Sequence, residues 1–284
     1  MFERFSRSWG LVKASAAVLA QDKELLVFPL ISGVAVLLVL ACFALPLFGL
    51  GALDGLSGHR GGTTSVGYYL VAFLFYVTQY FVIFFFNAAL VGAAMQKMNG
   101  EETSVGAGID LAWSRVGAIF GYAVIAATVG LILRAIEERV GFLGRIVVGL
   151  IGVGWTLATY LAVPVLVGQD IGPWQAVKES AGLLKRTWGE NVIGQAGLGT
   201  AFMLINLGLL LGIGVMVVFA LITQSVVVIV GAGIIAVAIL ILSALVHSAL
   251  SGIYAAALYR FATQQPVGGG FDAATLQSAF LPKK

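Results

Sequence analysis

Charged side chains are scarce in this sequence. Asp, Glu, Lys and Arg make up 10% of its 284 residues, whereas a soluble domain carries about 25%. Hydrophobic residues make up 60% of the chain, more than a soluble core of this length needs. The composition therefore excludes an ordinary soluble protein and predicts an all-α integral membrane protein.

Cysteine and buried acids are also missing. The single cysteine, Cys42, allows no disulfide within the chain and no cysteine-based metal site. The apolar runs hold no central Asp or Glu, which weighs against a proton- or sodium-coupled pump because such a pump needs a titrating group. Neither GxSxG nor HExxH occurs, and both motifs mark hydrolases. We therefore expect no enzyme activity, no cofactor and no metal.

Long uncharged runs are what the sequence has instead. A helix of about 20 apolar residues crosses a bilayer, and four runs suit one span each. A fifth, Asn191–Tyr259, is long enough for two and has its only polar break at Thr223–Ser225, where we predict a tight turn. Six transmembrane helices result. The four single spans are Leu25–Leu53, Gly61–Gln96, Val116–Leu133 and Ile146–Gln169. The second is rich in aromatic rings, which we expect to face lipid, with a surface that faces a partner as the alternative.

Basic residues predict the orientation. With the N-terminus inside, 12 of the 16 Lys and Arg residues fall on the inner side and four on the outer side. Inner segments of membrane proteins are enriched in these residues. We therefore expect a prokaryotic cytoplasmic (inner) membrane protein with both termini cytoplasmic. The exception is the arginine-rich loop Arg134–Arg145, which we interpret as a short interfacial extension of the third helix.

The charged segment Trp174–Trp188 belongs to a repeating pattern. Its apolar residues recur every three or four positions, as on one face of an amphipathic helix. Similar stripes run over Phe5–Leu19 and Val105–Val116. Each stripe precedes two predicted spans. The chain is therefore expected to hold three repeats of an amphipathic interfacial helix plus a transmembrane hairpin, at residues 1–100, 101–170 and 171–262, and a short cytoplasmic tail at 263–284.

Tryptophan and basic residues on these helices are the candidate contacts. Trp prefers headgroup depth, and Lys and Arg are attracted to anionic phosphates. The favoured interpretation is that the helices steer the chain back into the membrane, and the alternative is a collar that docks a partner. The candidate contacts with lipid headgroups or a partner are Arg7, Trp9, Lys13, Trp113, Arg115, Trp174, Lys178, Lys185, Arg186 and Trp188.

Polar residues within the spans form a second candidate set. Their amides could line a small passage, but more often such groups fix helix register. One of them, His247, shares a helix face with Ser243 and Ser251, so an intramembrane hydrolase is the least favoured alternative. The set comprises Gln79, Asn87, Asn206 and His247.

The N-terminal text "FERFSRSWGLVKASAAVLAQDKELLVFPLISG" carries a family resemblance. Its matching residues are Ser8–Trp9, Leu11–Lys13 and Asp22–Leu30, and the ending Tyr259–Asp272 fits as well. The text resembles an uncharacterised family of prokaryotic six-helix membrane proteins, catalogued as a domain of unknown function. The resemblance implies a membrane fold, and it implies neither catalytic residues nor a known substrate.

A membrane scaffold that organises partners is the function these observations favour. Its expected partners are the bilayer with its anionic phospholipids and a membrane or cytoplasmic protein. A second copy of the chain is a further alternative, because the pairs Gly117–Gly121 and Gly208–Gly212 permit close helix contacts. The net charge of +3 is spread over many loops and does not indicate nucleic acid. The alternative function is a passive transporter or channel for a lipid or small hydrophobic solute.

Overall fold

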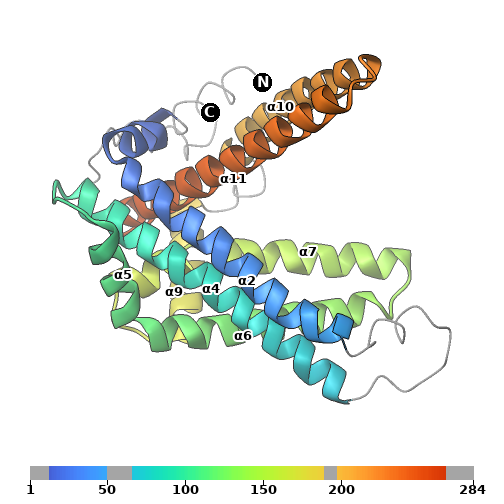
Figure 1. Cartoon of the computed structure of the whole chain (residues 1–284). Coiled ribbons are helices and arrows are strands. Elements are labelled where there is room, and N and C mark those ends of the chain that lie inside the picture. Colours follow the sequence, from blue (N-terminus) through green and yellow to red (C-terminus); the bar gives the residue numbers. More distant parts are fainter. Residues whose placement is uncertain (1–12, 50–65, 189–196, 267–284) are drawn as a thin grey trace, which may run out of the picture. The chain divides into compact units, whose positions relative to one another are not determined.

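A computed structural model describes residues 13–49, 66–188 and 197–266 (Figure 1). Every regular element in these ranges is a helix, which confirms the all-helical class. The described residues divide into two compact units. Unit 1 contains those up to Leu26, Ala94–Glu102 and those from Lys185 onward, and unit 2 contains the rest.

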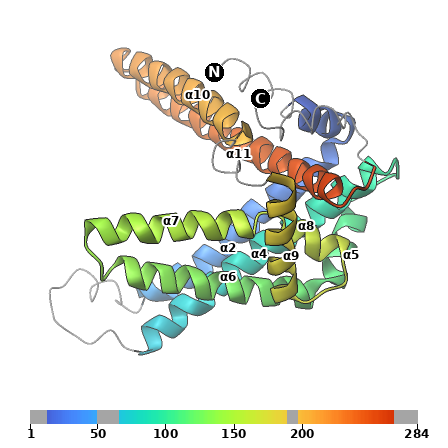
Figure 2. The ribbon, with the colours of Figure 1, turned by 180° about the vertical axis from the view of Figure 1, so that it is seen from behind.

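Unit 2 is built on long apolar helices joined to short amphipathic ones. Helices α6 and α7 run side by side in both views (Figures 1 and 2), and α5 and α9 are the amphipathic helices. The final residues of α4 and α9 continue into unit 1. The helices are α2 (Val27–Gly49), α4 (Val66–Met98), α5 (Val105–Ser114), α6 (Val116–Glu137), α7 (Phe142–Ala158), α8 (Ala162–Gly168) and α9 (Pro173–Trp188).

Unit 1 contains a helical hairpin. Helix α10 (Gly197–Ile222) and helix α11 (Val226–Ala262) lie side by side. The turn between them is Thr223–Ser225, as predicted, and Gln224 takes a positive φ of 52° there. Residues 13–21 form a further helix, and the 3-10 turn η1 (Lys23–Leu26) packs against α11.

Five helical stretches of the described residues are long and apolar enough to cross a membrane. Helix α10 contributes a shorter apolar stretch, Asn206–Ile222. The apolar helices are thus compatible with a membrane location. The five stretches are Lys23–Leu45, Leu70–Met98, Val116–Glu137, Phe142–Gly168 and Val226–Ala262.

The loop after the third span differs from the prediction. Helix α6 continues only to Glu137, and α7 begins at Phe142, so the segment Arg134–Arg145 is divided between two helices. Gly141 lies before α7 in an extended conformation. Glycine is accepted at such an N-cap, which allows the chain to reverse there. The expected extension of the third helix is therefore confirmed only as far as Glu137, and its interfacial location stays a prediction.

The fourth span is interrupted. Helix α7 ends at Ala158 and α8 starts at Ala162, with Thr159–Leu161 between them. Pro164 causes the break: inside a continuous helix its ring would clash with the carbonyl of residue 160 and its missing N–H would cost a hydrogen bond. In the first turn of α8 that N–H would have no helical partner anyway. The span predicted at Ile146–Gln169 thus corresponds to the apolar stretch Phe142–Gly168, which consists of two helices rather than one.

Aromatic rings of α4 pack against rings of neighbouring helices in unit 2. Phe75 meets Phe43 of α2 at 5.3 Å between ring centroids, and Phe84 stacks on Tyr122 of α6 at 4.5 Å. Phe85 also contacts Trp113 of α5, at 5.9 Å. The expectation that the rings of this span face lipid was therefore wrong for these three residues, because they face other rings.

The described residues contain three long runs of consecutive buried residues, one in unit 1 and two that lie wholly or almost wholly in unit 2. These are Ala88–Ala94 in α4, Leu161–Val167 at α8 and Gly252–Arg260 in α11, the longest such runs in the described parts of the chain. Each occupies the end of the second span of a predicted repeat. Farther along the long helices of unit 2, large apolar side chains are exposed, for example Leu37 and Leu150.

Candidate interfacial surface

Helix α5 is placed by its cap and by one glycine. The side-chain oxygen of Ser104 accepts a hydrogen bond from the Ala107 N–H at 3.1 Å, which caps the first turn. A Cβ on Gly108 would lie 2.6 Å from Cζ of Phe28 and 2.9 Å from the carbonyl oxygen of Ala89. Only glycine therefore allows α5 to approach α2 and α4 this closely.

The close packing of α5 on α2 and α4 places Trp113 at the surface. One side of its ring meets Phe85 edge-on at 5.9 Å between centroids, with an interplanar angle of 86°. The residue is nevertheless 65% exposed. A tryptophan fixed on one side and open on the other can insert at headgroup depth with little loss of side-chain freedom.

An ion pair joins the start of α6 to the loop before α9. The Arg115 guanidinium donates to the Asp170 carboxylate, while its buried Nε has no hydrogen-bond partner. Close by in sequence, a Cβ on Gly121 would lie 2.7 Å from Cγ of Pro173. The predicted contact residue Arg115 is thus already paired within the protein, and Gly121 accommodates the first residue of α9.

The buried face of α9 supplies a hydrogen-bond acceptor at the break between α7 and α8. Ser180 is fully buried, and its hydroxyl oxygen accepts a hydrogen bond from the backbone N–H of Leu161 at 3.0 Å. That N–H lies in the break between α7 and α8, where no helical partner is available. Val177 and Leu184 flank the serine on the same face. Helix α9 therefore contacts the fourth span through buried side chains and a buried hydrogen bond.

The outer face of α9 carries tryptophan and positive charge. Trp174 is 54% exposed, and the Lys178 ammonium lies 5.7 Å from its ring centroid. Lys185 and Arg186 are exposed in the last turn, where cations interact favourably with the helix dipole. Of the predicted stripe, Val177 and Leu184 are buried and Trp174 is not. Trp188 ends α9, and its side chain is outside the described residues.

The N-terminal candidates are described only in part. Arg7 and Trp9 lie outside the described residues, and Lys13 is exposed on the helix over residues 13–21. On the same helix, Ser15 is a polar residue that is fully buried. The texts "VKASA" and "VKESA" place Ser15 and Ser180 at the same position. The sequence analysis missed these serines, although aligning the two texts would have shown them.

The polar residues within the spans do not form one cluster. The Asn206 Oδ1 accepts a hydrogen bond from Ser243 at 3.3 Å, which links α10 to α11 as expected of a register-fixing pair. His247 lies one turn farther along α11, half-buried and engaged in an interaction. Gln79 and Asn87 lie about two turns apart on α4, and the Oε1 of Gln79 is buried without a hydrogen-bond partner.

The fold and this surface define an all-helical protein with apolar helices compatible with a membrane location. Among the described residues, no three His, Cys, Asp or Glu side chains come together in a metal-binding group.

A family model described as a family of unknown function, DUF6159, matches residues 66–269. The chain belongs to this family, which confirms the predicted membership of an uncharacterised family. The N-terminal text that carried the resemblance precedes the matched residues, so its role as a signature stays a prediction. No curated protein and no solved structure matches the chain.

Proposed function

We propose that this chain is a non-enzymatic, multi-pass protein of the prokaryotic cytoplasmic membrane that organises protein partners at its cytoplasmic face and binds anionic lipid headgroups there. One observation carries the proposal. Helices α5 and α9 are fixed by buried contacts, yet they present Trp113 and Trp174 outward together with the basic residues of α9.

Such a surface suits an anionic leaflet. Each Lys or Arg near the surface contributes about 1 kcal/mol of attraction to anionic lipids. The exposed cations Lys178, Lys185 and Arg186 lie on one short helix. Because packing already orders α9, binding does not carry the cost of folding a disordered segment.

The proposed architecture has six spans in three repeats, with both termini cytoplasmic. The order of elements supports it: a short helix precedes two spans at α5 and again at α9. The three buried runs at equivalent places support it as well. Orientation rests on the 12 inner and four outer Lys and Arg residues.

A charge-removal variant tests the function. The triple variant Lys178→Gln, Lys185→Gln, Arg186→Gln should retain less phosphatidylglycerol in native mass spectra than the wild type, and should lose partners captured by cross-linking in membranes. The matched control is Arg139→Gln with Arg145→Gln, two exposed arginines of the loop before and the start of α7, which should keep the cross-linked partners.

Unchanged lipid retention together with unchanged partners would contradict the proposal. The same proteins reconstituted in vesicles also test the alternative function. Passage of a small hydrophobic solute or lipid faster than in protein-free vesicles would favour a passive transporter.

A further inference from the structure

Helix α7 is attached to unit 2 along a narrow line. Helix α6 runs beside it in both views (Figures 1 and 2), and Val148 is its one buried residue. On either side of Val148, large apolar side chains such as Val147 and Leu150 are more than half exposed. The surface beside this contact line is therefore one that only hydrocarbon can cover favourably.

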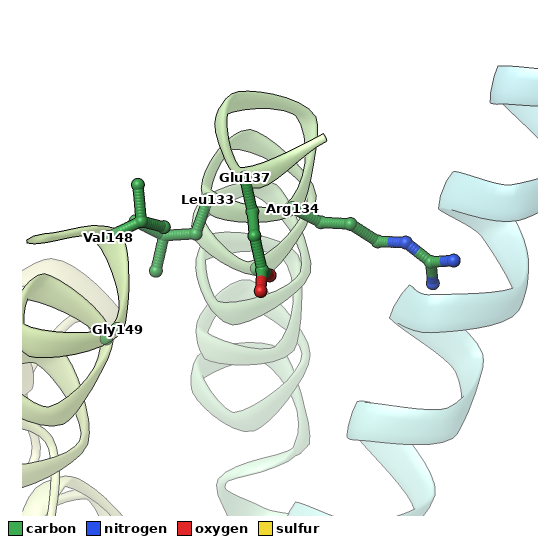
Figure 3. Close-up of a pocket in the computed structure, with 7 residues that line it drawn as sticks. Leu133, Arg134, Glu137, Val148 and Gly149 are labelled. Atoms are coloured by element: carbon green, nitrogen blue, oxygen red, sulfur yellow. The ribbon is translucent and has the colours of Figure 1, made fainter. Parts of the chain in front are cut away.

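A groove of about 470 Å³ lies between α6 and α7. Leu133 and Val148 face each other across it (Figure 3), and Gly149 and Gly152 form part of its wall. A Cβ on Gly149 would meet nothing within 4 Å, and one on Gly152 would meet only Leu133, at 3.9 Å. The two glycines thus leave this apolar groove open, with space for a flexible methylene chain.

Two opposite charges stand at the end of this groove, in the last turn of α6. Arg134 turns toward α4 (Figure 3): its Nε donates to Glu138 at 3.2 Å and its Nη1 donates to the Tyr76 hydroxyl at 2.7 Å. Glu137 lines the groove and takes part in none of the ion pairs of the described residues. The Arg134 charge is thus held in place by other partners, and the Glu137 carboxylate is left for a ligand.

We propose that this groove binds a phospholipid with a primary ammonium headgroup, of the phosphatidylethanolamine class. One acyl chain lies along Leu133, Val148 and Gly149. The ammonium donates to the Glu137 carboxylate, because a charge-assisted contact of this kind is strong. An anionic headgroup without an ammonium would face Glu137 unfavourably. The site lies at the opposite end of α6 from α5, so it is independent of the proposed cytoplasmic surface.

Lipid competition on the full chain tests the site. Purified protein in detergent receives equal amounts of phosphatidylethanolamine and phosphatidylglycerol with the same acyl chains, and native mass spectra report the bound lipid. All proteins in this test carry Lys178→Gln, Lys185→Gln and Arg186→Gln, which removes phosphatidylglycerol binding at α9, and in this background the chain should prefer phosphatidylethanolamine. Glu137→Gln should weaken its binding about tenfold, the effect of losing one charge-assisted contact. Glu102→Gln, an exposed glutamate in the loop before α5, should change nothing.

A second pair of variants tests whether the acyl chain lies in the groove. Gly149→Leu fills the groove, whereas Gly154→Leu adds the same side chain to α7 at a position that also has open space and does not line the groove. Only Gly149→Leu should reduce lipid binding. Equal binding by both variants, preference for phosphatidylglycerol, or a dimer that Gly149→Leu dissociates would overturn the proposal, the last because a second copy would then occupy the groove.

Discussion

Arg260 shows at the residue scale how a charge can be buried in this protein. The residue is 4% exposed. Its Nε donates to the carbonyl of Pro266 at 2.8 Å, and its Nη1 donates to the carbonyl of Met95 at 2.9 Å and to the Asn99 side chain. Within unit 1 the guanidinium thus links the ends of α11 and α4, and buried polar groups of this kind must be hydrogen-bonded.

Replacing Arg260 should therefore destabilise unit 1. Arg260→Met leaves the two carbonyl oxygens without their donor and should lower the free energy of unfolding by about 2–3 kcal/mol. Arg260→Lys should lower the free energy of unfolding by less than Arg260→Met does. It keeps the charge, but an ammonium lacks the planar fork that reaches several acceptors. Thermal unfolding followed by size-exclusion chromatography in detergent measures both. If Arg260→Met unfolds no earlier than the exposed control Arg139→Met, the hydrogen-bonded role is wrong.

Two glycines with different surroundings give a matched pair. Gly108→Ala forces a Cβ into the Phe28 ring and the Ala89 carbonyl and should cost about 1–3 kcal/mol of stability. Gly117→Ala, in α6, meets nothing within 4 Å and should stabilise by about 0.5–1 kcal/mol through helix propensity. Midpoints of thermal unfolding should move in opposite directions, and a shift in the same direction would contradict the close approach of α5.

At the element scale, sequence patterns located the amphipathic helices better than their buried faces. The 3.6-residue spacing predicted a helix at Trp174–Trp188, and α9 covers Pro173–Trp188. The predicted stripe placed Trp174 on one face with Val177 and Leu184, whereas the structure buries Val177 and Leu184 and leaves the Trp174 ring largely exposed. Tryptophan is amphipathic, so its spacing alone does not show which face packs.

The break inside the fourth span was not predicted, for a different reason. Its composition is continuous, so hydropathy gives no sign of the break at Thr159–Leu161. Pro164 was visible in the sequence, but whether a proline kinks a helix or starts a new one depends on the partner that satisfies the freed backbone group. Here that partner is Ser180, 19 residues away, and such a long-range contact cannot be predicted from local spacing.

Ser180→Ala tests this contact. The substitution leaves the buried Leu161 N–H without an acceptor and should cost about 1–3 kcal/mol. Hydrogen exchange should become faster at the amide of Leu161 than in the wild type. The control is Ser114→Ala, because Ser114 is exposed and bonds only to the carbonyl of Leu111 within its own helix. Equal exchange in both variants would show that Ser180 is dispensable for the break.

At the scale of the whole molecule, the three buried runs divide each predicted repeat into a packed end and an apolar, more exposed remainder. This division follows from small side chains: Ala88, Ala89 and Ala256 are completely buried, and small residues allow helix backbones to approach closely. The sequence showed these alanines, but it did not show that they mark the core, because apolar residues elsewhere in the spans are equally frequent.

Enlarging one alanine in a buried run should therefore be costly. Ala256→Leu overfills a fully buried position and should destabilise by about 1–3 kcal/mol. Ala244→Leu, at an exposed position of the same helix α11, should be close to neutral. The measurement is the fraction of protein that stays monodisperse after heating. Similar losses for both variants would argue against a core at the ends of the second spans.

The uncharged hairpin of α10 and α11 has a consequence for biosynthesis. From Asn191 to Tyr259 the chain carries no Asp, Glu, Lys or Arg, and the hairpin reverses at Thr223–Ser225. In the six-span topology proposed above this turn crosses the bilayer, which transfers three uncharged residues and no fixed charge and is far less costly than transferring an ionised side chain. The two helices can consequently enter the membrane together as one unit. The basic residues that flank the hairpin, Lys185, Arg186 and Arg260, then remain on the cytoplasmic side.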